Sequence, residues 1–271
     1  MTPQTKTYKR VLTIAGSDSG GCAGIQADLK TISACGCFGM SAITALTVQN
    51  TVGVRAIHVP PAEIVAGQIE AVLEDIGADA VKIGMLPTAE IVERVAGLLV
   101  RFGVPNVVLD PVMVATSGDA LIPHEAAEAI LHTLLPVVTV VTPNVPEAVH
   151  MTGLAVGSED DFPAAAARLR EMGAGAVLLK AGHLQQDELT DHLFAGGQVY
   201  THTYPRADTD NTHGTGCTLS SAVASYLALG HDLPEAVALA EEYIHKAILC
   251  GAEYRTGSGH GPVHHFFRWW E

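Results

Sequence analysis

The sequence predicts an α/β fold in which a mainly parallel central sheet is covered by helices on both faces. Short β-branched runs alternate with longer Ala-rich segments along most of the 271 residues, and this alternation is typical of repeated βα units. Hydrophobic residues make up 48% of the chain and aromatic residues only 5%. The core is therefore aliphatic, as suits parallel strands that are buried under helices on both sides.

The first predicted elements are a strand, a helix and a second strand. Val11–Ala15 is apolar and β-branched, and a glycine-rich loop leads from it to a helix at Ile25–Ala34. Met40–Val48 is again rich in β-formers. A helix follows Pro60-Pro61 and runs to about Glu74, because its apolar residues recur at helical spacing. The alternation then continues with strand Ala80–Ile83, helix Ala89–Phe102, strand Val107–Leu109, helix Glu125–Leu134, strand Val137–Thr142, helix Phe162–Met172 and strand Val177–Lys180.

The last third of the chain adds an edge and two closing helices. Leu193–Tyr204 carries Gly196-Gly197 between β-prone flanks, which predicts a hairpin at an antiparallel edge. Leu219–Leu229 and Pro234–Cys250 are predicted helices. Because no linker rich in Pro, Ser or charge divides the sequence, we expect one domain over residues 1–271, with residues 1–8 as a flexible N-terminal extension.

Charge and cysteine content exclude several classes of protein. The formal net charge of −14 argues against nucleic acid and against anionic membrane surfaces as partners. Met1–Arg10 lacks the apolar core of a signal peptide, and no apolar run is long enough to span a bilayer. The five cysteines form no C-x-x-C pair, which favours reduced thiols. We therefore expect a cytoplasmic protein.

The segment Asn211–Leu219 predicts an anion-binding turn. Gly214 and Gly216 allow a tight turn that directs successive N–H groups to one point, and a helix follows at once. A helix N-terminus with unpaired N–H donors attracts phosphate-like anions. Cys217 lies at this point, where a thiolate is favoured. The alternative is a structural turn with a buried cysteine, but the polar residues around the turn argue against it.

Other polar groups also follow predicted strands, where α/β sheets bind ligands. The loop Gly16–Gly24 matches neither common glycine-rich phosphate motif; it is either a flexible connection or a backbone that closes on a small ligand, with Asp18 and Asp28 available to it. Asp110 and the pair Asn144 and Glu147 could hold Mg²⁺. The same Asn-x-x-Glu spacing also fits a helix cap. The C-terminal histidines belong to an aromatic tail rather than a metal site, because Gly261 and Pro262 interrupt their spacing.

These segments together resemble the hydroxymethylpyrimidine/phosphomethylpyrimidine kinases of thiamine biosynthesis, within the ribokinase-like superfamily. The resemblance covers nearly the whole chain. Its most specific motifs are AGIQADLK at 23–30 and NTHGTGCTLS at 211–220, and it includes TIAGSD at 13–18, KIGML at 82–86, VVLDPVM at 107–113 and GPVHHF at 261–266. It implies the three-layer ribokinase-like fold and an ATP- and Mg²⁺-dependent kinase. The implied acceptors are 4-amino-5-hydroxymethyl-2-methylpyrimidine and then its monophosphate.

The resemblance also implies roles for individual residues. Gln49 would hydrogen-bond the aminopyrimidine edge, since an amide offers both a donor and an acceptor. The rest of the pyrimidine pocket would consist of Gly16, Asp28, Met85 and Val112.

On the nucleotide side, the resemblance places Asp110 and Glu147 near Mg²⁺ with Asn144 beside them, and Lys180 and Thr215 near the phosphates. The N–H groups of residues 214–217 would neutralise the transferring phosphoryl group. Cys217 occupies the position where sugar kinases of the superfamily use Asp as general base. We expect the helix N-terminus to lower the pKa of its thiol toward neutrality. By analogy with the superfamily, we also expect a homodimer.

Three positions depart from the family pattern. Gly20 and Cys22 replace the more usual Ser and Gly, and Glu241 stands where relatives commonly carry Lys. If that Lys approaches ATP in relatives, nucleotide affinity here would be weaker. Two other activities stay open: pyridoxal phosphorylation, alone or as a second activity, and a hydrolase in which Cys217 and His213 act as nucleophile and base. No glycine-flanked nucleophile motif supports the hydrolase.

Overall fold

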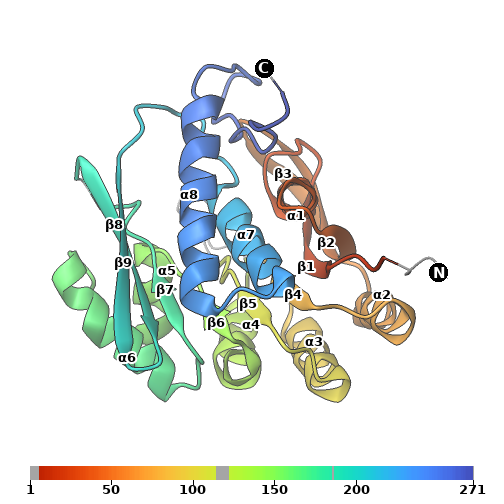
Figure 1. Cartoon of the computed structure of the whole chain (residues 1–271). Coiled ribbons are helices and arrows are strands. Elements are labelled where there is room, and N and C mark those ends of the chain that lie inside the picture. The colour runs from red at the N-terminus through yellow and green to blue at the C-terminus, as the bar shows by residue number, and fades with distance from the viewer. Residues whose placement is uncertain (1–5, 114–121, 185, 271) are drawn as a thin grey trace, which may run out of the picture.

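The predicted α/β fold with a mainly parallel sheet is confirmed. The computed structural model describes residues 6–113, 122–184 and 186–270. Its nine-stranded sheet has the order β3-β2-β1-β4-β5-β6-β7-β8-β9 (Figure 1). Six strands run parallel, and β3, β8 and β9 are antiparallel to their neighbours. The strands are β1 Arg10–Asp18, β2 Phe38–Asn50, β3 Gly53–His58, β4 Ala80–Ile83, β5 Val107–Leu109, β6 Val140–Val141, β7 Val177–Leu179, β8 Glu188–Ala195 and β9 Gln198–Pro205.

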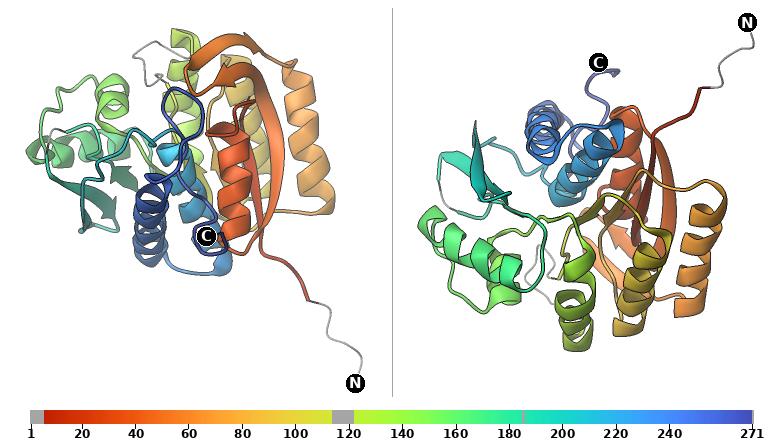
Figure 2. Two further views of the ribbon diagram at one scale, coloured as in Figure 1. Left: turned by 90° about the horizontal axis from the view of Figure 1, so that it is seen from above. Right: turned by 60° about the horizontal axis from the view of Figure 1, so that its bottom comes forward.

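Helices cover both faces of the sheet and bury two aliphatic layers against it (Figure 2). One layer contains α1, α7 and α8, and the other contains α2 to α6. The helices are α1 Gly24–Ala34, α2 Ala62–Asp75, α3 Ala89–Phe102, α4 His124–Ala129, α5 Val145–Thr152, α6 Phe162–Glu171, α7 Thr215–Leu229 and α8 Leu233–Gly251, with a π-helical turn at Ile130–Leu134 and 3₁₀ turns at Leu135–Val137 and Glu159–Asp161. None of the described helices has the length and apolarity needed to cross a membrane.

Helix α7 is the element that matters most for the site. It begins after Gly214 and ends before Gly230, and both glycines have left-handed backbone conformations. Its residues from Thr218 to Ala228 are buried on every side of the helix, because α1 and α8 flank it over the sheet. A helix enclosed in this way holds its N-terminal turn in a fixed position at the carboxyl ends of the strands.

The structure corrects several predicted boundaries. The strand predicted at Val137–Thr142 is limited to Val140–Val141, because Leu135–Val137 continues the preceding helix as a 3₁₀ turn. The predicted hairpin begins earlier, at Glu188, and its turn lies at Gly196-Gly197 as expected.

Two elements were not predicted. Strand β3 pairs antiparallel with β2, and its six residues are all exposed, so they carry no burial pattern. Helix α5 is only 8 residues long and has two strong N-terminal signals, Asn144 and Pro146. Of the predicted extension at residues 1–8, residues 1–5 lie outside the described residues, and the following residues precede β1.

Candidate functional site

The predicted anion-binding turn is present at the N-terminus of α7. Gly214 has a φ of 85°, and a Cβ there would lie 1.9 Å from the carbonyl oxygen of Cys22. Only glycine fits this position, because both its backbone angle and its packing exclude a side chain. Among the described residues, no group accepts a hydrogen bond from the N–H of Gly214, Gly216 or Cys217. Three donors at one helix end are therefore available to an anion.

The loop that follows β1 packs directly on this turn and is tightly held. The Asp18 carboxylate accepts hydrogen bonds from the N–H groups of Gly20, Cys22 and Ala23, at 2.8, 2.9 and 2.8 Å. These bonds contribute to lowering the pKa of Asp18, against the opposing effect of its burial. Gly24 has a φ of 56°, and its Cα approaches the Gly16 carbonyl so closely that a Cβ would lie 2.3 Å from that oxygen. The loop is a fixed wall rather than a flexible connection.

The first loop, the end of β2 and the turn are in contact with one another. The Gln49 amide nitrogen lies 3.1 Å from His213 Nε2. The Gln49 backbone exchanges hydrogen bonds with the Ser19 hydroxyl, and these bonds tie the end of β2 to the loop. Met85 is half-buried, and its terminal methyl is 3.9 Å from the position of a Cβ on Gly16. The structure therefore places Met85 beside Gly16 and ties Gln49 to the first loop and to the turn. That these residues bind a pyrimidine stays a prediction.

The predicted nucleotide and metal residues gather at the carboxyl ends of β5, β6 and β7. The Lys180 ammonium lies 3.3 Å from Asp110 Oδ1, and Asp110 is almost wholly buried. A Cβ on Gly216 would lie 3.3 Å from Lys180 Nζ and 3.5 Å from both Asp110 oxygens. The ion pair thus lies directly against the anion-binding turn.

Asn144 and Glu147 serve a structural role whatever else they do. Asn144 Oδ1 accepts from the Glu147 N–H, and Glu147 Oε2 accepts from the Asn144 N–H, both at 2.9 Å. This reciprocal capping box starts α5. Burial raises the pKa of Glu147 to about 7, opposed by the Lys180 ammonium. One carboxylate oxygen is used in the cap, and the carboxyl group lies close enough to Lys180 and Asp110 to interact with both charges.

Asp28 does not lie on an open pocket surface. Its carboxylate is fully buried and contacts Lys82 Nζ at 2.9 and 3.0 Å. It also accepts hydrogen bonds from Thr13 and Ser221. The sequence reasoning missed Lys82, although a single lysine inside a buried four-residue strand was a signal. A buried charge requires a partner, and Asp28 is that partner.

The expected low pKa of Cys217 is wrong for the structure described. Burial raises the pKa of the thiol to about 12, and the Lys82 ammonium only partly opposes this effect. The Gly24 N–H also favours the thiolate, but more weakly than burial disfavours it. The thiol is therefore protonated at neutral pH, even though it lies in the first turn of α7.

Two further predicted residues and the C-terminal tail complete the surroundings. Thr215 donates its hydroxyl proton to the Thr212 carbonyl at 2.7 Å, and its N–H bonds the same oxygen, so neither points freely at a phosphate. Val112 is half-buried after β5. The tail is only partly packed: Phe266 and Phe267 pack against the layer of α1, α7 and α8, whereas Trp269 and Trp270 are exposed. His265 Nε2 lies 3.1 Å from the Thr218 hydroxyl, and burial lowers the pKa of His265 to about 3.

Glu241 lies beside the nucleotide side of the site. It is 4% exposed, and its Oε1 has no hydrogen-bond partner among the described residues. Burial and the neighbouring Asp191 carboxylate raise its pKa well above the ordinary value, so Glu241 carries a proton and bonds Asp191. Asp191 Oδ1 in turn accepts from the Ala181 N–H at 2.7 Å. The departure from the family's Lys thus produces a buried carboxyl pair behind Lys180.

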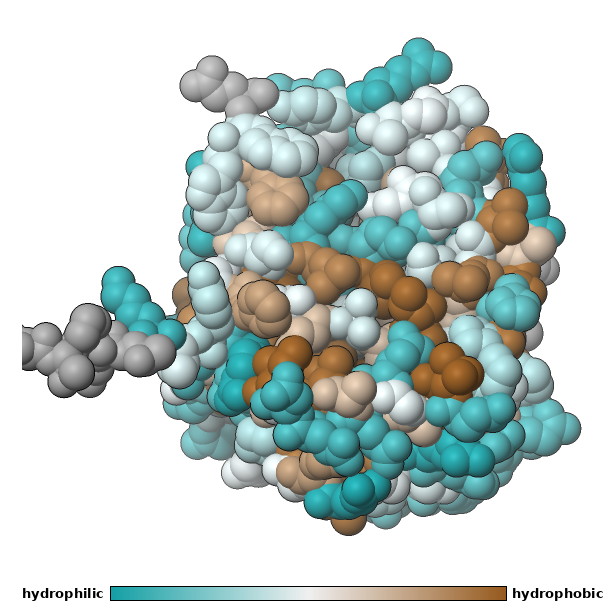
Figure 3. All heavy atoms as spheres, turned by 90° about the vertical axis from the view of Figure 1, so that its right-hand side faces the viewer, coloured by the Kyte–Doolittle hydropathy of each residue, from teal (hydrophilic) through white to brown (hydrophobic). Residues whose placement is uncertain are grey.

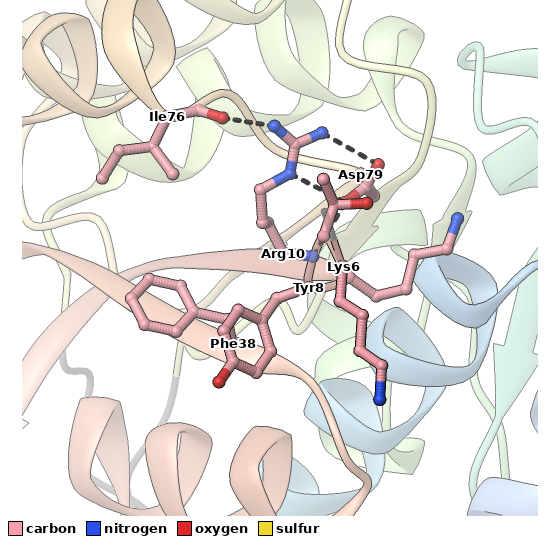
Figure 4. Close-up of a pocket in the computed structure, with 8 residues that line it drawn as sticks. Lys6, Tyr8, Arg10, Phe38, Ile76 and Asp79 are labelled. Atoms are coloured by element: carbon pink, nitrogen blue, oxygen red, sulfur yellow. Dashed lines mark hydrogen bonds and ion pairs between the residues drawn. The ribbon is translucent and has the colours of Figure 1, made fainter. Parts of the chain in front are cut away.

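A separate hollow lies at the opposite, amino-terminal end of β1 (Figure 4). Arg10 crosses it to pair with Asp79 at 3.0 Å and also donates to the Ile76 carbonyl. Tyr8 and Phe38 line its side. None of the predicted site residues lines it, so it plays no part in the site described above.

Comparison with known proteins identifies the family. The family model for phosphomethylpyrimidine kinase matches residues 18–264. The hydroxymethylpyrimidine/phosphomethylpyrimidine kinase of Rhizobium meliloti (strain 1021) is 52% identical over 261 residues, which cover 96% of this chain and 98% of the relative.

Solved structures give the same result. Phosphomethylpyrimidine kinase from Clostridium difficile 630 is 44% identical with a TM-score of 0.80, covering 88% of this chain and 99% of that one. The ADP complex of Bacillus subtilis pyridoxal kinase is 35% identical with a TM-score of 0.90, covering 97% and 100%. The predicted ribokinase-like fold and the predicted family are both confirmed. The chain belongs to the phosphomethylpyrimidine kinase family.

Proposed function

We propose that this protein uses ATP to phosphorylate hydroxymethylpyrimidine and then its monophosphate, giving the diphosphate used in thiamine biosynthesis. The observation that supports it best is the convergence of the N–H donors of Gly214, Gly216 and Cys217, for which no described residue is an acceptor, with the Lys180–Asp110 pair. Phosphoryl transfer depends mainly on positioning and on neutralising charge. The names of the relatives point to the same activity.

The pyrimidine is proposed to bind between the first loop and β2. Gln49 offers an amide donor and acceptor to the ring edge. Gly16, Met85 and Val112 are proposed to offer backbone and apolar surface to the rest of the ring. Asp28 is proposed to act indirectly. Its ion pair with Lys82 fixes the position of the buried Lys82 ammonium, which interacts with Cys217.

The ATP phosphates are proposed to lie over the turn, with Mg²⁺ held by Asp110 and Glu147. Both carboxylates are buried within the interaction range of Lys180, and carboxylate oxygens are the ligands that Mg²⁺ prefers. Magnesium would supply charge neutralisation between the phosphates. Lys180 would move from Asp110 toward a phosphate oxygen, and Asn144 holds Glu147 in place through the cap. Thr215 supports the turn through its bonds to Thr212.

Cys217 is proposed as the group that receives the proton of the substrate hydroxymethyl group. For this role the thiol must first lose its own proton, which requires a lower pKa than the protein shows in the structure described. The Lys82 ammonium and the helix N-terminus both favour the thiolate. As the oxygen attacks the γ-phosphorus, its proton passes to the sulfur and the bond from the γ-phosphorus to the β–γ bridging oxygen breaks to release ADP.

The test is incubation with ATP, Mg²⁺ and hydroxymethylpyrimidine, followed by mass spectrometry of the products. The proposal predicts the monophosphate first and the diphosphate later. Pyridoxal is offered in parallel, because a pyridoxal kinase shares this fold at a TM-score of 0.90. Phosphorylation of pyridoxal without any pyrimidine product would overturn the assignment, whereas phosphorylation of both would establish a second activity.

A homodimer is the proposed assembly of a single kinase domain. Exposed apolar side chains occur along the β2–β3 hairpin, on both of its faces (Figure 3). They are Leu46, Val48, Val52, Val54 and Ile57, with Val59 and Ile64 nearby. An apolar patch of this kind is commonly an interface. Light scattering of the wild type and of Val48→Asp tests it: a dimer that the substitution dissociates is expected.

The five free thiols suit a reducing cytoplasm.

A further inference from the structure

A cluster of metal-ligating side chains lies at the junction between the first loop and the anion-binding turn. The ligand atoms of Asp18, Cys22 and His213 all lie within 4.8 Å of one another. In the part of the chain that the structure describes, no other group of three such residues meets this condition. The three residues come from two segments that are far apart in the sequence, so the fold creates the cluster.

The distances suit a small tetrahedral ion. His213 Nε2 and Asp18 Oδ2 are 3.6 Å apart. Bonds of about 2.0–2.3 Å from a zinc ion to N, O and S ligands place neighbouring tetrahedral ligands roughly 3.3–3.6 Å apart. The cluster therefore needs only a small contraction to bind such an ion.

The surrounding hydrogen bonds already orient the ligands. Three backbone N–H groups hold the Asp18 carboxylate, as outer-shell partners do in metal sites. The Gln49 amide nitrogen lies 3.1 Å from His213 Nε2 and helps to hold the ring in place. Asp18 Oδ2 lies 3.6 Å from the same ring nitrogen, so a cation between the two atoms would contact both.

The Cys22 sulfur determines which metal ions the cluster binds most tightly. Its side chain is 1% exposed, and burial beside Asp18 raises the pKa of its thiol. Thiolate and imidazole favour Zn²⁺ over Mg²⁺, which binds oxygen ligands. The millimolar Mg²⁺ of a kinase assay would therefore not compete for this cluster.

We propose that Asp18, Cys22 and His213 form a regulatory site for Zn²⁺ or a similar soft divalent cation, and that the bound ion inhibits the kinase. On binding, a metal–sulfur bond forms and the Cys22 thiol proton leaves to solvent. Water completes the fourth position. The ion fixes the first loop to the turn and occupies His213 Nε2 next to Gln49, so it raises the KM for the pyrimidine. This kinetic effect rests on the proposed role of Gln49, whereas metal binding itself does not.

The direct test is titration of the full-length protein with Co²⁺, a spectroscopic substitute for Zn²⁺. We expect a thiolate-to-cobalt charge-transfer band in the near ultraviolet, which Zn²⁺ abolishes. Cys22→Ser should lose the band and bind Zn²⁺ on the order of 100-fold more weakly in competition with a coloured chelator, since one of three protein ligands is lost. Cys250→Ser, which changes an exposed thiol on α8, should keep both the charge-transfer band and the wild-type affinity for Zn²⁺. Thermal unfolding confirms that each variant is folded.

Several results would overturn the proposal. A cobalt spectrum without a thiolate band, or an unchanged band in Cys22→Ser or Cys22→Gly, would remove Cys22 from the site. Loss of the band in Cys217→Ala alone would move the metal to the turn. For the kinetic effect, micromolar Zn²⁺ should raise the KM for the pyrimidine in the wild type and leave Cys22→Ser unaffected. An unchanged wild-type KM at saturating Zn²⁺ would overturn the inhibitory role.

Discussion

Replacing Gly214 by alanine perturbs the anion-binding turn and its contact with the first loop. The backbone has a φ of 85°, and the new Cβ would lie 1.9 Å from the Cys22 carbonyl oxygen. The left-handed conformation costs about 1–2 kcal/mol for a residue with a Cβ. Relief of the overlap requires the loop or the turn to move, which costs about 1–3 kcal/mol more. The expected loss of unfolding free energy is therefore roughly 2–5 kcal/mol.

The expected loss of activity is larger than the loss of stability suggests. Movement of the turn misplaces the N–H donors of residues 214–217, and loss of one such donor costs on the order of 10²–10³ in kcat. The matched control is Gly230→Ala at the other end of α7. Gly230 also has a positive φ, of 101°, but no atom lies within 4 Å of its added Cβ. The Gly230→Ala variant should lose about 1–2 kcal/mol of unfolding free energy and keep the wild-type kcat.

The assay measures kcat for hydroxymethylpyrimidine and the urea midpoint of each variant at a temperature where both are folded. A Gly214→Ala enzyme that is folded and turns over within about threefold of Gly230→Ala would refute the reasoning, because a displaced donor set cannot leave the barrier unchanged. Equal loss in both variants would show that backbone strain in α7, rather than the turn, controls activity.

Three other substitutions probe the buried groups. Lys82→Met should lower the unfolding free energy by about 3–5 kcal/mol, since it leaves a buried carboxylate unpaired, and Asp28→Asn in the same chain should recover most of the loss in urea unfolding. Cys217→Ala should lower kcat about 10²–10⁴-fold if the sulfur is the proton acceptor; near-normal turnover in a steady-state assay would exclude that role. The pKa of Glu241 is raised in the folded state. The stability that its protonation contributes is therefore fully present below the ordinary pKa of a glutamate and is lost as the pH rises. Glu241→Gln should therefore gain stability over the wild type with increasing pH, by at most about 1.4 kcal/mol per unit; a constant difference would contradict the shared proton with Asp191.

The layers of the fold and the position of the turn could be predicted because both depend on residues that are close together in the sequence. Alternating apolar segments indicate strands and helices wherever burial follows the pattern. Gly214 followed by a helical run indicates a helix N-terminus near the turn, although the helix predicted from Leu219 begins earlier, at Thr215. The six exposed residues of β3 carry no such pattern. Helix α5 is too short for its apolar periodicity to be visible, although its capping residues were recognised as a possible cap.

The electrostatics of the site could not be predicted in the same way. Whether Asp28 contacts substrate or Lys82 depends on how α1, β4 and α7 pack together, and residues 28, 82 and 221 meet only in the folded chain. The thiol pKa of Cys217 has the same origin: the helix N-terminus is local, but the burial that outweighs it comes from distant segments. The cluster of Asp18, Cys22 and His213 likewise joins two separate loops.

In the proposed reaction, the turn at residues 214–217 holds the transferring phosphoryl group of the transition state more tightly than it holds the phosphates of the nucleotide before transfer. The most direct measurement compares the dissociation constants of ADP alone and of ADP with aluminium fluoride, a mimic of that group, in the presence of Mg²⁺ and hydroxymethylpyrimidine. We predict that Gly214→Ala weakens the mimic at least about tenfold more than it weakens ADP, because only interactions that strengthen in the transition state lower the barrier. Equal weakening of both ligands would contradict the claim.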